Sequence, residues 1–269
     1  YCLYRYSRPV LVGLFLFMCC VLITALADKG MMMPTPYIQL DNINLADRLY
    51  VNQLALFGGT ITHIIGQNGA GKSTLLEVMA GLLSVNTTSR LATGSTGAST
   101  SSILPNTPAA QVAQYRCCLT QANHSVFVLT VAELFAFYTP HTQAPIELDS
   151  ILEVNQFLLR SMDELSTGQR QRVHLARCMM QIWDAVQRGE GILLFDEPFD
   201  ALDLAYQLKW MNWLHTIKQR GNVIVIVHHQ LVLLQDCPDD DVIIVNAGQI
   251  VEHGQISRVW NKTCLTQHF

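Results

Sequence analysis

One glycine-rich stretch limits what this chain can fold into more than any other part of the sequence. Residues 66–74 read Gly-Gln-Asn-Gly-Ala-Gly-Lys-Ser-Thr and match the phosphate-loop pattern G-x-x-x-x-G-K-[ST] at every fixed position. A mostly apolar run at 61–65 precedes the stretch, and apolar residues at helical spacing follow it between Leu75 and Leu83. This order predicts a buried strand, a loop that binds phosphate, and a helix that begins at the loop.

The residue types in this stretch suit a bound triphosphate. Glycines allow main-chain N–H groups to converge on phosphate oxygens, Lys72 can bridge the β- and γ-phosphates, and the Ser73 hydroxyl can bind Mg²⁺. The start of a helix also favours negative charge, through its unpaired N–H groups and its dipole. The expected phosphate-binding residues are Gly66, Asn68, Gly69, Ala70, Gly71, Lys72, Ser73 and Thr74.

Two adjacent carboxylates, Asp196 and Glu197, follow the apolar run at 192–195. Ligands bind at the carboxyl ends of strands in a doubly wound sheet, so this pair is expected at the ligand crevice. Asp196 is placed to hold Mg²⁺, and Glu197 can orient and deprotonate an attacking water. The alternative is a pair that only caps the next turn.

The charge and the cysteine content exclude several classes of function. A formal net charge of -4, without a long basic run, argues against a general nucleic-acid binder. The eight cysteines include no C-x-x-C spacing, so neither a zinc knuckle nor a secreted disulfide framework is indicated. We expect reduced, buried thiols. At 269 residues the chain can bury a core without disulfides.

Residues 1–30 differ from the rest, because Val10 to Ala27 is almost purely apolar and follows Arg5 and Arg8. Three interpretations stay open: a membrane anchor, a signal peptide, or an extension translated from upstream of Met31. After this run, the expected strands lie at 37–40, 61–65, 115–120, 192–195, 223–227 and 242–245, with a hairpin turn at 246–248. Helices broken by Pro140 and Pro145 are expected between 130 and 160, and loops with weak edge strands at 84–107.

Residues 165–177 form a third pattern, Leu-Ser-Thr-Gly-Gln-Arg-Gln-Arg-Val-His-Leu-Ala-Arg, which is a short polar turn that opens a helix. This pattern lies between the phosphate loop and the Asp-Glu strand. In that position it resembles the signature Leu-Ser-Gly-Gly-Gln of the ATP-binding-cassette (ABC) ATPase family. The resemblance covers about residues 37–254. It implies an α/β fold, a P-loop NTPase of the ABC type, with an antiparallel β subdomain and a helical subdomain at about 122–165 within a domain at 31–269.

The resemblance also implies ATP as the nucleotide and a head-to-tail homodimer that sandwiches two ATP molecules. Ser166, Gly168 and Gln169 would then contact the γ-phosphate held by the other copy's phosphate loop. Gln121 matches the family's glutamine loop, which touches Mg²⁺ and the attacking water. Asp203 lies in the loop after the catalytic glutamate, which runs along the dimer interface.

Three positions depart from the family pattern. Thr167 replaces the usual glycine of the signature, and a histidine pair, His228 and His229, stands where the family has one switch histidine before an aspartate. Alternation along the strand favours His229 as the residue that donates to the γ-phosphate and holds Glu197. No clear aromatic residue is available to stack on the adenine, and Tyr50 is the nearest candidate.

The phosphate loop with its helix, and the glutamine-containing link from Met180 to Gly191, resemble the ATPases of vitamin B12 (cobalamin) importers. This implies a peripheral ATPase at the cytoplasmic face of the membrane, with permease subunits as partners and, indirectly, a periplasmic or extracellular solute-binding protein. An iron-siderophore or haem importer ATPase is the near alternative. Alternatives of other classes are an ABC ATPase that acts on DNA and a module that binds ATP without turnover.

Overall fold

The computed structural model describes residues 36–45, 48–83, 90–93, 101–103, 112–120, 129–230 and 232–259. The apolar run of residues 1–30 and the predicted site residue Gln121 lie outside these ranges. Among the described helices, none has both the length and the apolar character that a bilayer crossing requires.

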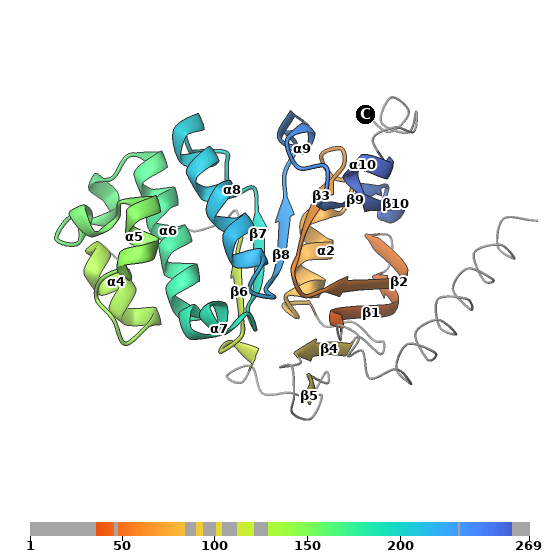
Figure 1. Cartoon of the computed structure of the whole chain (residues 1–269), viewed down its shortest axis with the longest axis horizontal. Helices are drawn as coiled ribbons and strands as arrows, with labels where there is room; N and C mark the ends of the chain where they lie inside the picture. The colour runs from red at the N-terminus through yellow and green to blue at the C-terminus, as the bar shows by residue number, and fades with distance from the viewer. Residues whose placement is uncertain are drawn as a thin grey trace, which may run out of the picture. The chain divides into compact units, whose positions relative to one another are not determined.

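The described strands form one mixed sheet in the order β5-β4-β1-β2-β10-β9-β3-β8-β7-β6 (Figure 1). Strands β6, β7, β8, β3 and β9 run parallel to one another, whereas β9 pairs antiparallel with β10, and β1 pairs antiparallel with β2 and β4. The bounds are β1 (Pro36–Leu45), β2 (Leu49–Phe57), β3 (Thr60–Ile65), β4 (Arg90–Thr93), β5 (Ser101–Ile103), β6 (Arg116–Leu119), β7 (Ile192–Asp196), β8 (Val223–Val227), β9 (Asp241–Asn246) and β10 (Gln249–Gln255).

Helices cover both faces of the parallel strands. The α-helices are α2 (Lys72–Met79), α4 (Val131–Tyr138), α5 (Ile146–Leu152), α6 (Thr167–Gln181), α7 (Trp183–Arg188), α8 (Leu204–Lys218), α9 (Val232–Gln235) and α10 (Ile256–Val259). Two 3-10 turns, η1 (Asn155–Phe157) and η2 (Met162–Glu164), connect α5 to α6. In Figure 1, α4 and α5 lie beside α6, away from the strands that carry the phosphate loop.

Side chains of the parallel strands alternate between two cores. On β7, Leu193 and Phe195 pack with residues of α6 and α8, while Ile192 and Leu194 pack with residues of α2. Strand β8 shows the same alternation. Burial on both faces explains why these strands are continuous apolar runs in the sequence. The α/β fold with an antiparallel part, which the sequence predicts, is confirmed.

One helix boundary differs from the sequence-based expectation. The helix after the phosphate loop ends at Met79, short of Leu83, because Gly81 adopts a left-handed φ of 61° and turns the chain. Leu82 is therefore mostly exposed. Pro140 and Pro145 separate α4 from α5, as the sequence predicts, and Pro145 is the N-cap of α5, where its fixed φ is compatible with helix initiation.

Candidate nucleotide-binding site

The phosphate loop joins the end of β3 to the start of α2. Gly71 is the N-cap of α2 with a φ of 103°, a left-handed value that favours glycine. Gly66 lies against β9, and a Cβ at this position would come within 2.1 Å of the Val245 carbonyl oxygen. The loop can therefore pass this strand only without a side chain at residue 66.

Lys72 holds the loop in a closed shape. Its Nζ donates to the carbonyl oxygens of Gly66 and Gln67, at 2.9 and 3.0 Å, and the residue is only 6% exposed. An ammonium group has three N–H donors, so these two bonds leave one for an anion in the loop. A buried positive charge at a helix start is suited to binding phosphate.

Asp196 is the last residue of β7 and is buried beside the phosphate loop. The pKa of its carboxyl is raised, mainly by burial, and a hydrogen bond from Ser73 offsets part of the rise. Its Oδ1 is buried and has no hydrogen-bond partner among the described residues. Carboxylate and hydroxyl oxygens are the ligands that Mg²⁺ prefers, so this pair fits Mg²⁺.

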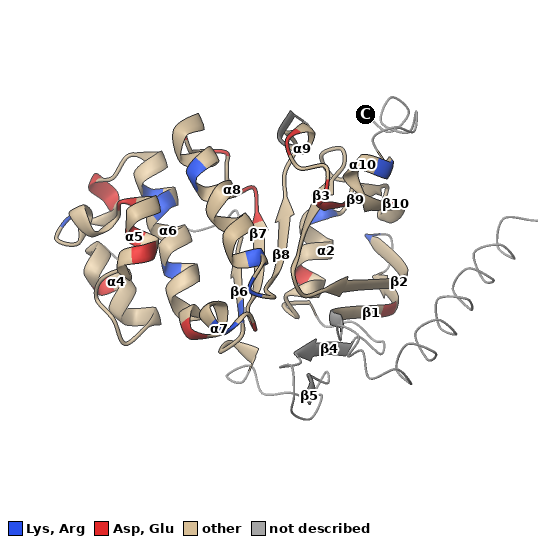
Figure 2. Cartoon of the chain, viewed as in Figure 1, with Lys and Arg blue, Asp and Glu red and all other residues tan. Residues whose placement is uncertain are grey.

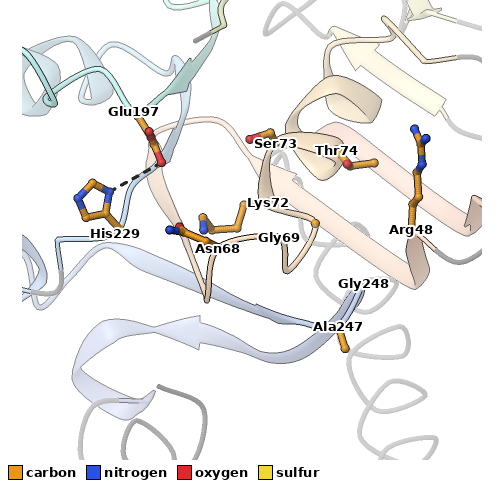
Figure 3. A pocket seen from close by; sticks show the side chains of 11 residues that line it. Arg48, Asn68, Gly69, Lys72, Ser73, Thr74, Glu197, His229, Ala247 and Gly248 are labelled. Atoms are coloured by element: carbon orange, nitrogen blue, oxygen red, sulfur yellow. Dashed lines mark ion pairs between the residues drawn. The ribbon is translucent and has the colours of Figure 1, made fainter.

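Glu197 follows in a left-handed conformation, with a φ of 49°, and its N–H donates to the Val227 carbonyl at 2.9 Å. This conformation is unusual for a residue with a side chain and is found mainly at turns and functional sites. The Glu197 Oε1 lies 3.7 Å from His229 Nδ1 (Figure 3). The same Nδ1 is 4.0 Å from Asp200 Oδ1. The Asp200 pKa is raised to about 6 by burial, by a hydrogen bond to Glu197 and by the negative charge of Glu197.

The two histidines of the pair occupy different environments. His229 is half exposed and lines the cavity with Glu197. His228 is 1% exposed, and its Nε2 lies 3.0 Å from Nδ1 of His63 in the core. Burial lowers the His228 pKa to about 3, so this imidazole stays neutral. Of the pair, only His229 therefore lines the cavity.

These elements surround a cavity of about 830 Å³ (Figure 3). Its lining residues are Arg48, Asn68, Gly69, Gly71, Lys72, Ser73, Thr74, Glu197, His229, Ala247 and Gly248. Sequence reasoning missed Arg48, Ala247 and Gly248, which come from the β1–β2 and β9–β10 turns. The hairpin turn predicted at 246–248 could have pointed to Ala247 and Gly248. The sequence did not show which segment pairs with this turn. Tyr50 is half exposed and is not among the lining residues.

The β9–β10 turn is attached directly to the phosphate loop. Ala247 and Gly248 both have positive φ, 45° and 75°, as a type I′ turn requires. The Gly248 N–H donates to the Ala70 carbonyl at 2.8 Å, and the Tyr50 N–H donates to the Gly248 carbonyl at 2.7 Å. The three backbone segments are thereby joined at one edge of the cavity.

The signature stretch lies outside the cavity lining of this chain. Ser166 is the N-cap of α6 in a capping box: it accepts from the Gln169 N–H at 3.3 Å and donates its N–H to Gln169 Oε1 at 3.0 Å. Thr167 is helical without a positive φ, so its side chain causes no backbone strain. A Cβ on Gly168 would come within 2.7 Å of the Ala201 carbonyl oxygen. Asp203 caps α8 by accepting from the Tyr206 N–H.

Comparison with known proteins agrees with this geometry. A family model described as "ABC transporter" matches residues 51–200. A vitamin B12 import ATP-binding protein of Yersinia pseudotuberculosis serotype I (strain IP32953) is 30% identical over 240 residues, which cover 86% of this chain and 91% of that protein. A hemin import ATP-binding protein of Rhodopseudomonas palustris (strain ATCC BAA-98 / CGA009) is 31% identical over 221 residues, which cover 80% of this chain and 78% of that protein.

The fold is also similar to a solved structure of a nucleotide-free ATP-binding cassette from an ABC transporter. The TM-score is 0.66 at 21% identity, and the match covers 87% of this chain and 98% of that one. At this identity the likeness concerns the fold alone. The family model spans more than half of the 269 residues, from β2 to the turn after Glu197. The chain therefore belongs to the ABC transporter family and contains its ATP-binding domain.

Proposed function

We propose that this chain is the ATP-hydrolysing subunit of an ABC importer, with Glu197 as the residue that activates the attacking water. The observation that carries the proposal is the convergence of the phosphate loop, Glu197 and His229 on one cavity. A triphosphate bound through Lys72 would have its terminal phosphate on the side of the cavity that Glu197 and His229 line. A water between the phosphate and Glu197 is then within reach of a general base.

The proposed chemistry consists mainly of positioning and charge stabilisation. Lys72 and the main-chain N–H groups of the loop hold the β- and γ-phosphate oxygens, and His229 keeps Glu197 oriented toward the water. Asp196 and Ser73 would hold Mg²⁺, which supplies positive charge to the same oxygens when bound. Glu197 takes the proton of the attacking water as the bond to phosphorus forms.

A second copy of the chain completes the proposed site. Ser166, Gly168 and Gln169 lie at the start of a 15-residue helix but do not line the cavity of their own chain. Placed against another copy's γ-phosphate, this helix start adds N–H and hydroxyl donors only when the two copies close. Asp203 lies in the turn against which Gly168 packs, so it belongs to the same interface in this proposal.

We propose vitamin B12 as the imported solute, with a haem or iron-siderophore importer as the alternative. Support comes from the vitamin B12 and hemin import relatives, at 30% and 31% identity. In such a complex the chain would lie peripherally at the cytoplasmic face of the membrane, bound to permease subunits that receive solute from a binding protein. Purifying the permease with this chain, and finding which solute stimulates ATP hydrolysis by the complex, tests the choice.

An ABC ATPase that acts on DNA is less well supported. Such a protein needs long coiled-coil helices between the phosphate loop and the signature. In the described part of that region, no helix exceeds the eight residues of α2 or α4. Figure 2 also shows Asp and Glu on α5, which contacts α6 and α8, the helices that carry Arg and Lys. A surface that binds a phosphate backbone needs a continuous basic stripe, and the carboxylates of α5 oppose one.

The substitution Glu197→Gln tests the proposed base. We expect steady-state ATP hydrolysis to fall at least about a hundredfold, since general-base catalysis contributes about 10²–10⁴. ATP binding should persist, and two copies should remain associated around ATP in analytical ultracentrifugation. Asp200→Asn is the matched control, because it removes a carboxylate 4.0 Å from His229 but leaves Glu197 in place. It should retain most of its turnover. Unimpaired hydrolysis by Glu197→Gln would refute the role.

A further inference from the structure

A second cluster of polar side chains lies in the core between the sheet and α8, away from the nucleotide cavity. Three potential metal ligands, His63 of β3, Cys237 and Asp240, are buried there, and their ligand atoms all lie within 4.8 Å of one another. His215 of α8 adjoins them, with Nε2 at 3.6 Å from Cys237 Sγ and 3.7 Å from Asp240 Oδ2. None of these side chains has a role in the proposed ATP chemistry.

Three separations between these ligand atoms are close to those of a tetrahedral metal site. Zn²⁺ binds nitrogen and oxygen at about 2.0–2.2 Å and sulfur at about 2.3 Å, which separates neighbouring ligands by about 3.3–3.6 Å. His63 Nε2 and Asp240 Oδ2 are 3.3 Å apart, close to this spacing, as are the two distances from His215. Histidine, cysteine and aspartate together are a ligand set that zinc uses.

The surroundings of the cluster also suit a bound cation. Asp240 divides its oxygens: Oδ2 faces the imidazoles, while Oδ1 accepts from Lys218 Nζ at 2.6 Å. A hydrogen bond that holds the second oxygen of a carboxylate ligand is typical of metal sites. His63 is held on its other side, where Nδ1 lies 3.0 Å from His228 Nε2. The His215 side chain is 34% exposed, which leaves an entry path from solvent.

We propose that His63 Nε2, Cys237 Sγ and Asp240 Oδ2, with His215 Nε2 on the solvent side, form a binding site for Zn²⁺. Two anionic ligands, the carboxylate and the thiolate, balance the charge of the cation. Cys237 releases its thiol proton to solvent when the metal binds. The site joins β3, α8 and the segment between α9 and β9, so its function is to brace these elements.

The metal would also fix the histidines behind the nucleotide cavity. With Nε2 of His63 on the metal, its proton resides on Nδ1 and is donated to His228 Nε2. His228 directly precedes His229, which lines the cavity beside Glu197. The site therefore supports the end of β8 from which His229 projects.

Binding of Co²⁺ to the full chain tests this site, because a thiolate ligand gives cobalt a charge-transfer band in the near ultraviolet. Chelator-treated protein with saturating Mg²⁺ is titrated with Co²⁺ and then with Zn²⁺. We expect one equivalent of Co²⁺, the charge-transfer band, and its loss as Zn²⁺ displaces cobalt. Cys237→Ser should abolish the band, and His215→Ala should weaken Zn²⁺ binding at least about tenfold.

Cys178→Ser is the matched control, since Cys178 is a buried free thiol on α6 outside the cluster. It should keep both the band and the stoichiometry, and circular dichroism should verify the fold of each variant. If Cys237→Ser fails to fold, His215→Ala decides alone, because the His215 side chain is partly exposed. A folded chain that binds no equivalent of Co²⁺ or Zn²⁺, a band that survives Cys237→Ser, or unchanged Zn²⁺ affinity in His215→Ala would overturn the proposal.

Discussion

The contact between Gly66 and β9 gives a prediction whose size follows from the structure. In Gly66→Ala the new Cβ would start 2.1 Å from the Val245 carbonyl oxygen, whereas side-chain carbons keep at least 3.0 Å from such atoms. The loop and β9 must therefore separate by about 1 Å, and overpacking of this kind costs about 1–3 kcal/mol. The positive φ of 155° lies in a region that is essentially restricted to glycine, and it adds about 1–3 kcal/mol for a residue with a Cβ.

Gly69→Ala is the matched control. Gly69 also has a positive φ, 77°, but a Cβ there would have no atom within 4 Å, so only the backbone cost of about 1–2 kcal/mol applies. Urea unfolding without nucleotide should show Gly66→Ala less stable than Gly69→Ala by about 1–3 kcal/mol. Equal losses would refute the packing argument. Because a displacement of about 1 Å can cost a hundredfold in rate, Gly66→Ala should also lose most ATP hydrolysis.

Two further substitutions test the packing of α6. Gly168→Ala should destabilise the fold by about 1–3 kcal/mol in urea unfolding, because its Cβ would lie 2.7 Å from the Ala201 carbonyl oxygen. Burial lowers the His174 pKa to about 4, so between pH 6.5 and 4 the unfolded chain takes up a proton that the folded chain does not. Stability is therefore lost as pH falls, and His174→Gln should lose about 2 kcal/mol less than the native chain between pH 7.5 and 5.

Local sequence patterns predicted most of the fold and part of the candidate site. The phosphate loop and the Asp196-Glu197 pair are each contiguous in sequence, so residue type and spacing were enough to predict them as site residues. Continuous apolar strands predicted a sheet covered on both faces, and the two cores have that arrangement. Alternation along β8 favoured His229 over His228, and His229 is the one that lines the cavity.

Residues brought together by strand pairing were not predictable in the same way. Gly248 reaches the cavity because Gln249 of β10 pairs with Tyr50 of β2, a register that no local pattern specifies. His63 and Asp240 are 177 residues apart and meet only because β9 lies beside β3. A histidine on an apolar strand gave no sign of such partners. The missed residues therefore depend on strand pairing between distant segments.

The capping box at α6 is compatible with the proposed contact across two copies. Ser166 uses its Oγ to accept from the Gln169 N–H, so its hydroxyl proton can still be donated to a phosphate oxygen. Gln169 accepts with Oε1 from the Ser166 N–H, which leaves its amide NH₂ as a donor. Gly168 packs on the Ala201 carbonyl and Gln171 donates to Pro198 O, so the helix start is held against the loop after Glu197. A second copy that engages this helix start would therefore also act on the loop that carries Glu197.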